Sequence, residues 1–239
     1  MDGPVVTALV DHCYDYIIQR ERFDSTSNAL KDIPKKLEFQ LSWETLQDIE
    51  KAKSSHARLR DEMDLLIYKF QNYGKEFVKS RNMSPDSFVQ MALQLAFYKM
   101  HKVPCAMYES VTTREFLHGR TEVVRGTSSQ SANFCRTFES PHSTREEKEH
   151  SLRKAVAKHK HDANLVSARC DAVMMIAPLA RDGYCVFYNV LKDSFNFGVS
   201  SFKSCPETSA LRFSEALEQS LTEMRNCVAQ SNPAVGART

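Results

Sequence analysis

A small cluster of basic residues suggests the first chemistry. Lys75 and Lys79 stand four residues apart, directly after Gly74 and a short way before Ser84-Pro85. A lysine ammonium binds phosphate as a point charge, and the N-terminus of the helix that we expect after Ser84 would add attraction for an anion. The spacing therefore fits a compact phosphate site. An ordinary solvated loop has the same composition, and on spacing alone it is the more common case.

A second polar segment runs from Tyr108 to Glu122 and is dense in hydroxyl and guanidinium groups. Donors of this kind, gathered in a pocket, hold a small carboxylate. A pair of polar strands would have the same composition, so both interpretations stay open. A third segment, Ser200–Thr208, also carries many hydroxyls. Ser204 or Thr208 is expected to cap the helix that follows, which is a structural role.

The composition is that of an ordinary globular protein. Of 239 residues, 42% are hydrophobic and 26% are charged, and the net charge of +2 favours neither nucleic acid nor an anionic membrane as a partner. The seven cysteines show no C-x-x-C spacing, so we expect free thiols and no metal site. No apolar run approaches the roughly twenty residues of a membrane span, and no signal peptide is expected. These features indicate a soluble, intracellular protein.

The periodicity of the apolar residues predicts alternating helices and strands, the pattern of an α/β or α+β protein. Ser84 is expected as the N-cap of the clearest helix, with Pro85 at its first position, and residues 127–145 as loop or weak helix. Further helices are expected at Val5–Ile18, Trp43–Ala52, Glu146–Lys160 and Phe213–Val228. Strands are expected at Lys36–Leu41, Leu65–Tyr68, Ala172–Ala177, Tyr184–Tyr188 and Asn196–Phe202.

Three motifs resemble those of one known family, the carnitine/choline O-acyltransferases. From Tyr108 the chain reads Tyr-Glu-Ser-x-Thr-Thr-Arg-x-Phe-x-His-Gly-Arg-Thr-Glu, which is similar to the family signature. Gly-Lys-x-Phe-x-Lys from Gly74, and Ser-Pro-Asp-x-Phe-x-Gln-Met-Ala-Leu-Gln-Leu-Ala from Ser84, resemble the family's coenzyme A segment. Ser-Cys-Pro-Glu-Thr from Ser204 looks like its C-terminal end. The likeness covers nearly the whole chain and is greatest to the carnitine acetyltransferase members.

The resemblance implies roles for five residues. Lys75 and Lys79 match the lysines that hold the 3′-phosphate of coenzyme A, and Asp86 matches the acid near its adenine. Tyr108 and Thr121 match residues that hydrogen-bond the carboxylate of carnitine. The resemblance implies no tightly bound cofactor, since coenzyme A and acetyl-CoA act as substrates.

Two further positions bear on specificity through the same resemblance. Met174 and Met175 fall near the family's acyl-length gate, where a bulky side chain would favour acetyl over longer acyl groups. The pair Thr121-Glu122 is similar to the carnitine enzymes, whereas choline enzymes typically carry Val-Asp there. Choline as acceptor stays open as an alternative.

Two parts of the family pattern are missing from the sequence. The family's general base is a histidine just upstream of a segment like Met1–Val6, and none of the eight histidines matches it. After Arg169 the family carries several dozen further residues, with an arginine that pairs with carnitine and a Ser-Thr-Ser motif that supports the oxyanion. We therefore assign no catalytic residue. We expect residues 1–232 to be the C-terminal part of an acyltransferase domain and residues 233–239 to be a frayed tail.

The resemblance also implies a fold and a reaction. The expected fold is α/β, the chloramphenicol-acetyltransferase-like fold of coenzyme A-dependent acyltransferases, with a mixed sheet flanked by helices in its C-terminal half. The expected reaction is reversible transfer of a short acyl group between coenzyme A and carnitine, by a monomer in mitochondria or peroxisomes. This chain alone is expected to be inactive. The alternative from another class is a remnant that binds coenzyme A or a partner without chemistry.

Overall fold

The computed structural model describes residues 39–113, 116–166 and 177–229 of the chain. The chain divides into two compact units, Met1–Met63 and Asp64–Thr239. The expected helix at Val5–Ile18 lies outside the described residues, as does nearly all of the expected strand at Ala172–Ala177 and the whole of the tail. Within the described ranges, no helix is long and apolar enough to cross a membrane.

The described part of the first unit holds one helix, α2 (Trp43–Glu62), which confirms the expected helix and extends it. Ser42 caps α2 by accepting the amide N–H of Thr45. The strand expected at Lys36–Leu41 is wrong where it is described, because residues 39–42 adopt no regular structure. Alternating apolar residues form a strand only where a partner strand satisfies the backbone groups.

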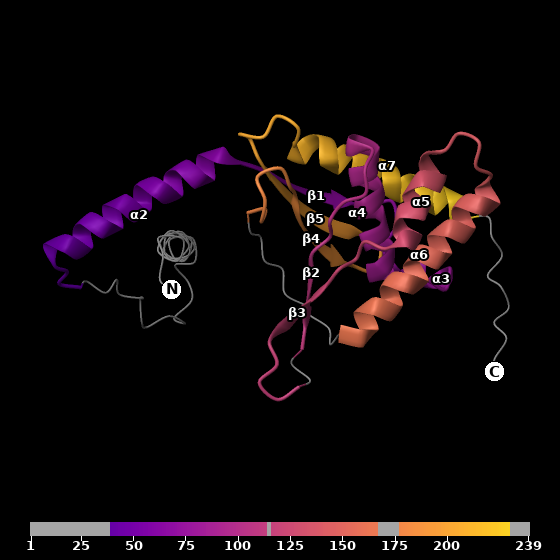
Figure 1. The fold of residues 1–239 in the computed structure, drawn as a ribbon, viewed down its shortest axis with the longest axis horizontal. Helices are drawn as coiled ribbons and strands as arrows, with labels where there is room; N and C mark the ends of the chain where they lie inside the picture. Colours follow the sequence, from indigo (N-terminus) through magenta and orange to yellow (C-terminus); the bar gives the residue numbers. More distant parts are fainter. Residues whose placement is uncertain (1–38, 114–115, 167–176, 230–239) are drawn as a thin grey trace, which may run out of the picture. The chain divides into compact units, whose positions relative to one another are not determined.

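The second unit is built on a three-stranded sheet with the order β1-β5-β4 (Figure 1). In β4 and β5, which form an antiparallel hairpin, Val190 pairs with Phe195 and Cys185 with Ser200. The central strand, β5, is buried along nearly its whole length. Three expected strands are thus confirmed, with slightly different ends. Their bounds are β1 (Met63–Phe70), β4 (Cys185–Val190) and β5 (Phe195–Phe202).

The edge strand β1 buries only one of its two faces. Leu66 and Tyr68 pack against the core, whereas Leu65 and Ile67 are 48% and 69% exposed. Successive side chains of a strand point to opposite faces, so the continuous apolar run leaves half of its side chains uncovered. The expectation of a buried strand is therefore correct for one face of β1 only.

Two helices, α4 (Pro85–His101) and α7 (Ala210–Ala229), pack against each other and against the inner face of this sheet (Figure 1). Burying one large apolar side chain stabilises a fold by about 1.5–3 kcal/mol, so this layer supplies much of the core. Tyr73 adds a polar tie, because its hydroxyl donates to the carbonyl of Leu221 at 2.6 Å. The largest buried side chains of this core are Phe88, Met91, Leu95, Phe195, Phe197, Leu217, Leu221 and Met224.

The ends of α4 follow directly from its sequence. Ser84 accepts the amide N–H of Ser87, and Pro85 occupies the first turn, where its missing donor has no cost. The helix stops where Lys102 takes a left-handed conformation, with φ of 58°. Every residue from Ser87 to Ala96 is buried. The prediction of this helix is confirmed, and α4 is the central helix of the unit.

A further layer beside α4 consists of two helices and a second, two-stranded sheet (Figure 1). The two strands are antiparallel and both contact α6. The helix expected at Glu146–Lys160 is confirmed and is longer at both ends. The bounds are β2 (Glu109–Thr112), β3 (Thr121–Val124), α5 (Ser129–Glu139) and α6 (Arg145–Val166).

The helix α5 decides between the two expectations, loop or weak helix, at residues 127–145: Ser129–Glu139 are helical and the residues on either side are not. Ser128 and Ser131 form a reciprocal capping box at its start, and Phe134 and Phe138 are buried on its inner side. Serine, threonine and asparagine have low helix propensity, but the cap and the buried aromatic rings outweigh this weak preference.

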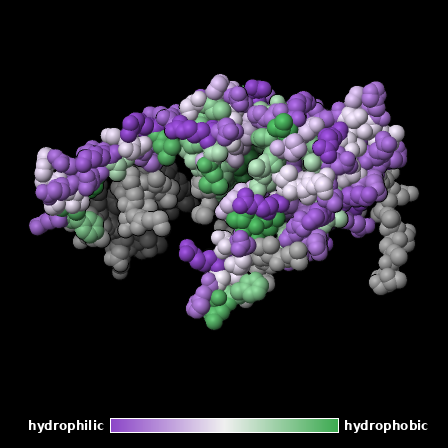
Figure 2. Space-filling model, in the orientation of Figure 1, coloured by the Kyte–Doolittle hydropathy of each residue, from purple (hydrophilic) through white to green (hydrophobic). Residues whose placement is uncertain are grey.

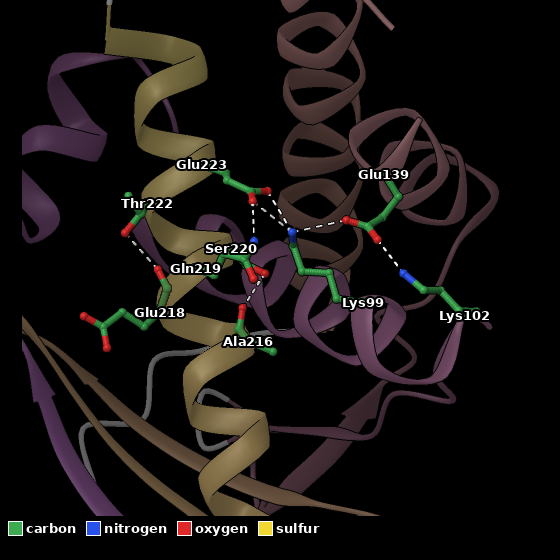
Figure 3. A network of polar contacts seen from close by, with 9 residues as sticks. All are labelled: Lys99, Lys102, Glu139, Ala216, Glu218, Gln219, Ser220, Thr222 and Glu223. Atoms are coloured by element: carbon green, nitrogen blue, oxygen red, sulfur yellow. Dashed lines mark hydrogen bonds and ion pairs between the residues drawn. The ribbon is translucent and has the colours of Figure 1, made fainter. Parts of the chain in front are cut away.

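An ion network ties the C-terminal end of α4 to its neighbours (Figure 3). The ammonium of Lys99, whose side chain is only 11% exposed, lies 3.1 Å from Glu139 of α5 and 2.9 Å from Glu223 of α7. Lys102 also reaches Glu139, at 2.6 Å. Burial favours a higher pKa for Glu139, but the hydrogen bonds from Lys102 and Lys99 outweigh it and hold that pKa below its ordinary value.

The expectation that Ser204 or Thr208 caps α7 is wrong. The N–H of Ala210 donates instead to the carboxylate of Asp64 on β1, at 2.7 Å, and Ser209 accepts an amide from the first turn. Thr208 donates its hydroxyl to carbonyls of the preceding turn. The first turn of α7 is therefore capped twice, by the adjacent Ser209 and by Asp64 from a strand far away in the sequence, and local spacing cannot reveal the second cap.

Candidate functional site

The two lysines of the basic cluster lie on a short helix, α3 (Lys75–Ser80), that the sequence analysis did not predict. Lys75 is its first residue and is partly buried, while Lys79 lies one turn later and is exposed. Residues four apart share one face of a helix, so both ammonium groups are presented together. The arrangement suits a doubly charged phosphate group.

The start of α3 is built on the turn between β4 and β5. The amide of Lys75 donates to the carbonyl of Leu191 at 2.9 Å, and that of Glu76 donates to Lys192 at 3.2 Å. The first two amides of α3 are therefore used within the fold. Attraction for an anion at this point depends on the lysine charges rather than on the helix N-terminus.

Gly74 makes this close approach possible. A Cβ atom at position 74 would lie 2.3 Å from the backbone nitrogen of Ser194 and 2.5 Å from the carbonyl oxygen of Lys192. Real Cβ atoms essentially never come so near to backbone atoms. Only glycine lets the chain pass at this distance, so Gly74 sets the position of both lysines against the hairpin.

Asp86 lies in the first turn of α4, and α3 packs against this helix. Its carboxylate accepts a hydrogen bond from the hydroxyl of Tyr188 on β4, at 2.5 Å. Gln90, one turn along α4, donates its side-chain amide to the same hydroxyl oxygen at 2.9 Å. Asp86 is thus held by a partly buried tyrosine that belongs to the sheet.

The pKa of Asp86 is shifted by its burial and by the neighbouring side chains. Burial raises the pKa of its carboxyl group, and the nearby charge of Glu109 raises it further, while the hydrogen bond from Tyr188 and the position of His159 act in the opposite direction. Burial also raises the pKa of Tyr188 well above its ordinary value, as do the Asp86 and Glu109 charges. Titratable groups perturbed in this way cluster at functional sites.

A buried histidine from α6 completes the polar network. The His159 side chain lies 3.1 Å from the Ser87 hydroxyl through Nδ1 and 2.9 Å from Glu109 Oε2 through Nε2. His159 is only 2% exposed. Because a carboxylate oxygen accepts, Nε2–H donates to Glu109, and in the neutral ring Nδ1 accepts the Ser87 hydroxyl hydrogen. One side chain thereby joins the first turn of α4 to the first residue of β2.

The segment with the carnitine-side signature forms the β2–β3 pair. Glu109 lies opposite the buried Val124, and this face of the pair lies against α6. Since strand faces alternate, Tyr108, one residue earlier, and Thr121, which pairs with Thr112, fall on the opposite, exposed face. Both interpretations left open by the sequence are therefore compatible: a polar strand pair presents the two hydroxyls on one surface.

The His118-Gly119 part of the signature shapes the loop at the tip of this hairpin. His118 takes a left-handed φ of 61°, and a Cβ at Gly119 would lie 1.8 Å from the carbonyl oxygen of Thr113. Figure 2 shows hydrophobic surface at the tip, where Phe116 and Leu117 are 68% and 88% exposed. His118 and Gly119 therefore contribute to this loop through their backbone conformation.

Some expected site residues could not be placed, and some residues of the network were not expected. Met174 and Met175 lie outside the described residues. Tyr188 and His159 had no sequence signal, since neither falls in a motif, whereas Glu109 belongs to the signature and could have been singled out. Among the residues that the structure describes, no group of three or more histidine, cysteine, aspartate or glutamate side chains could hold a metal ion.

Comparison with known families gives two matched stretches. Residues 1–168 and 163–219 both match the family model described as Choline/Carnitine o-acyltransferase. The two stretches meet near residue 165, where the sequence analysis expected several dozen residues to be missing.

Individual relatives agree with this family match. A carnitine O-acetyltransferase from Columba livia is 34% identical over 278 residues, covering 97% of this chain and 44% of that protein. The Homo sapiens protein of the same name is 33% identical, with the same coverage. A peroxisomal carnitine O-octanoyltransferase from Bos taurus is 28% identical, covering 90% of this chain and 44% of that protein. The chain thus spans less than half the length of these relatives.

Proposed function

Because the chain belongs to the choline/carnitine O-acyltransferase family, we propose that it holds the substrates of acyl transfer between coenzyme A and carnitine. The chain is an acyltransferase by family, and we propose the chloramphenicol-acetyltransferase-like fold for the complete domain. The observation that carries the proposal is the pairing of α3 with α4. Two lysines on one face of α3 lie on a helix that packs against the one bearing Asp86.

Each of these residues has a defined task in the proposal. The ammonium groups of Lys75 and Lys79 bind the 3′-phosphate of coenzyme A, and the carboxylate of Asp86 accepts an N–H of the adenine. On the exposed face of the β2–β3 pair, the hydroxyls of Tyr108 and Thr121 donate to the carboxylate of carnitine. Carnitine and the acyl-CoA ester are the small-molecule partners, and the enzyme is monomeric.

Calorimetry with coenzyme A and with 3′-dephospho-coenzyme A tests the phosphate site. We expect the wild-type chain to bind coenzyme A about tenfold more tightly than the dephospho form, a difference of about 1.4 kcal/mol. The double variant Lys75→Ala and Lys79→Ala should bind both forms equally. A matched control, Lys51→Ala with Lys53→Ala on α2, removes two exposed lysines and should keep the preference. Equal affinity of the wild type for both forms would rule out this site.

The chain alone is proposed to lack turnover. The family's base histidine has no counterpart among its eight histidines, and losing a general base costs about 10²–10⁴-fold in rate. The alignment with the Columba livia protein runs over 278 residues, more than the 239 of this chain, which supports a missing internal segment. Incubating the chain with acetyl-CoA and carnitine should release no free thiol above background. Clear turnover would contradict the proposal.

We further propose a short acyl group, acetyl, as the one transferred. The support is the likeness to proteins named carnitine O-acetyltransferase and the two bulky methionines, Met174 and Met175, near the family's gate. Competition between acetyl-CoA and octanoyl-CoA for the chain measures this preference. By the same likeness, we propose a mitochondrial or peroxisomal location.

Two alternatives remain distinguishable by binding. Choline as acceptor predicts that choline, and not carnitine, perturbs the Tyr108 ring in NMR spectra. If the chain is a remnant that binds without chemistry, it should bind coenzyme A but show no turnover. Turnover should stay absent even when the remaining part of a relative is added as a separate chain.

A further inference from the structure

The polar network links the two segments proposed to hold different substrates. Asp86 and Ser87 are neighbours in the first turn of α4, on the coenzyme A side, and Glu109 directly follows Tyr108 on the carnitine side. The two segments are some twenty residues apart in sequence, and a single side chain from α6 touches both. His159 contacts Ser87 at 3.1 Å and Glu109 at 2.9 Å.

The surroundings make this link stiff. His159 is 2% exposed and Ser87 1% exposed, so water does not compete for the hydrogen bond between them, and the Glu109 side chain is only 14% exposed. Gly126, just after β3, lies against the ring, since a Cβ there would be 3.6 Å from His159 Cδ2. The carbonyl of Gly126 also accepts the side-chain amide of Gln94 on α4, at 3.0 Å. The imidazole is therefore enclosed by α4 and the β2–β3 pair and has little room to turn.

We propose that His159 is a positioning residue that couples the coenzyme A segment to the carnitine segment. The inference rests on the proposed function and deepens it. A ligand that engages Asp86 fixes the first turn of α4; Ser87 and His159 pass this restraint to Glu109, and the strand that carries Tyr108 becomes ordered. Coenzyme A binding thus orders the carnitine segment relative to the coenzyme A segment before carnitine binds.

Hydrogen–deuterium exchange of the 239-residue chain, with and without coenzyme A, tests the coupling. In the wild type, coenzyme A should slow exchange at residues 74–90 and also at residues 105–125, the latter by about fivefold or more, as is typical of coupled sites. If His159 had only a structural role, its substitution would change the exchange rates equally with and without coenzyme A. The decisive measurement is therefore the difference in exchange that coenzyme A causes.

Two substitutions of His159 separate its two hydrogen bonds. The side-chain amide of glutamine lies about where Nε2 lies, and that of asparagine about where Nδ1 lies. The coupling needs both bonds, so His159→Gln, which keeps only the bond to Glu109, and His159→Asn, which keeps only the bond to Ser87, should each lose the response at residues 105–125 while keeping that at residues 74–90. His161→Ala, an exposed histidine on the same helix, serves as the control and should behave as wild type. If His159→Asn does not fold, Glu109→Gln weakens the same bond from the other side.

Each outcome decides one of the two proposals. Protection at neither segment of the wild type would overturn the proposed function itself. Protection confined to residues 74–90 in the wild type, or a response at residues 105–125 that persists in His159→Asn, His159→Gln or Glu109→Gln, would overturn the coupling through His159 while leaving the coenzyme A site intact.

Discussion

The hydroxyl of Tyr188 on β4 donates a 2.5 Å hydrogen bond to the carboxylate of Asp86 in the first turn of α4. The two residues are 102 positions apart, so the contact exists only in the folded chain. It places a carboxyl group in a partly buried site where its negative charge is poorly solvated. A group kept under such conditions commonly serves binding rather than stability.

The first prediction is that Asp86→Asn stabilises the chain at neutral pH. Because the pKa of Asp86 is raised in the folded state, its contribution to stability is greatest below the unfolded-state pKa and is lost as pH rises through the folded pKa. Asparagine cannot ionise, yet its oxygen still accepts the Tyr188 hydrogen bond. Thermal unfolding should show a higher Tm for the variant at pH 7 and no difference near pH 3.

The matched control for this prediction is Asp182→Asn, in an exposed turn, which should leave Tm unchanged at both pH values. A lower Tm for Asp86→Asn at pH 7 would mean that the ionised carboxylate is well stabilised and that the argument from burial is wrong. In binding assays the same substitution should weaken coenzyme A, so stability and function are expected to change in opposite directions.

The second prediction concerns the glycine between the hairpin and α3. Gly74→Ala should destabilise the second unit by about 1–3 kcal/mol or more, because its Cβ would meet backbone atoms of residues 192–194 that cannot move without shifting the hairpin. Gly126→Ala is the comparison, since its Cβ would make only ordinary contacts, the nearest at 3.5 Å. Urea unfolding of the two variants measures the difference, and equal midpoints would contradict the account of Gly74.

The third prediction separates two lysines of one ion network. Lys99→Met should destabilise the chain by about 1–3 kcal/mol, because it removes the shared partner of the Glu139 and Glu223 carboxylates, and the Lys99 side chain is only 11% exposed. Lys102→Met should cost at most about 1 kcal/mol, since Lys102 is 65% exposed. Equal destabilisation by both substitutions, in urea unfolding, would contradict the difference in burial.

The same network has a defined pH dependence. The pKa of Glu139 is held below its ordinary value in the folded state. Its stabilising contribution is therefore present above the unfolded-state pKa and is lost as pH falls through the folded pKa. The stability difference between wild type and Glu139→Gln should be full at pH 6–7 and shrink in acid, which is opposite in sign to the behaviour of Asp86.

The fourth prediction addresses the acceptor. Thr121→Val preserves shape but removes the hydroxyl that is proposed to donate to the carnitine carboxylate. A hydrogen bond to a charged group contributes about 1.5–3 kcal/mol, so carnitine binding should weaken about tenfold or more, while choline binding stays the same. Thr222→Val on α7, a partly exposed threonine far from β3 in sequence, is the control. Ligand-detected NMR titrations give both affinities.

Local sequence signals predicted the elements whose ends depend on neighbouring residues. The start of α4 is one example, since Ser84 and Pro85 specify it within three positions. The helix α5 shows the opposite case, because the composition of its segment left loop and weak helix both open, and only the capping box and the buried phenylalanines identify the helix. The prediction of a strand up to Leu41 was wrong because alternating apolar residues do not show whether a partner strand is available.

The candidate site was predictable only in part. The lysines and hydroxyls fall in motifs, so their positions could be transferred from a resemblance. The network around them could not, because Tyr188, His159 and Asp64 act on residues fifty or more positions away. The charges that surround the site residues depend on packing, and packing is set by the whole fold.

The contact between Gly74 and the β4–β5 turn also has a practical meaning for protein engineering. Hairpin turns ordinarily tolerate inserted residues, peptide tags or new chain ends. Here the turn at residues 191–194 is the surface on which α3 begins, so lengthening it by a single residue would displace both lysines. A label for spectroscopy is better placed in the exposed stretch at residues 141–142, between α5 and α6. Under the proposal that Lys75 and Lys79 bind a phosphate, the length of this surface turn determines the position of that phosphate.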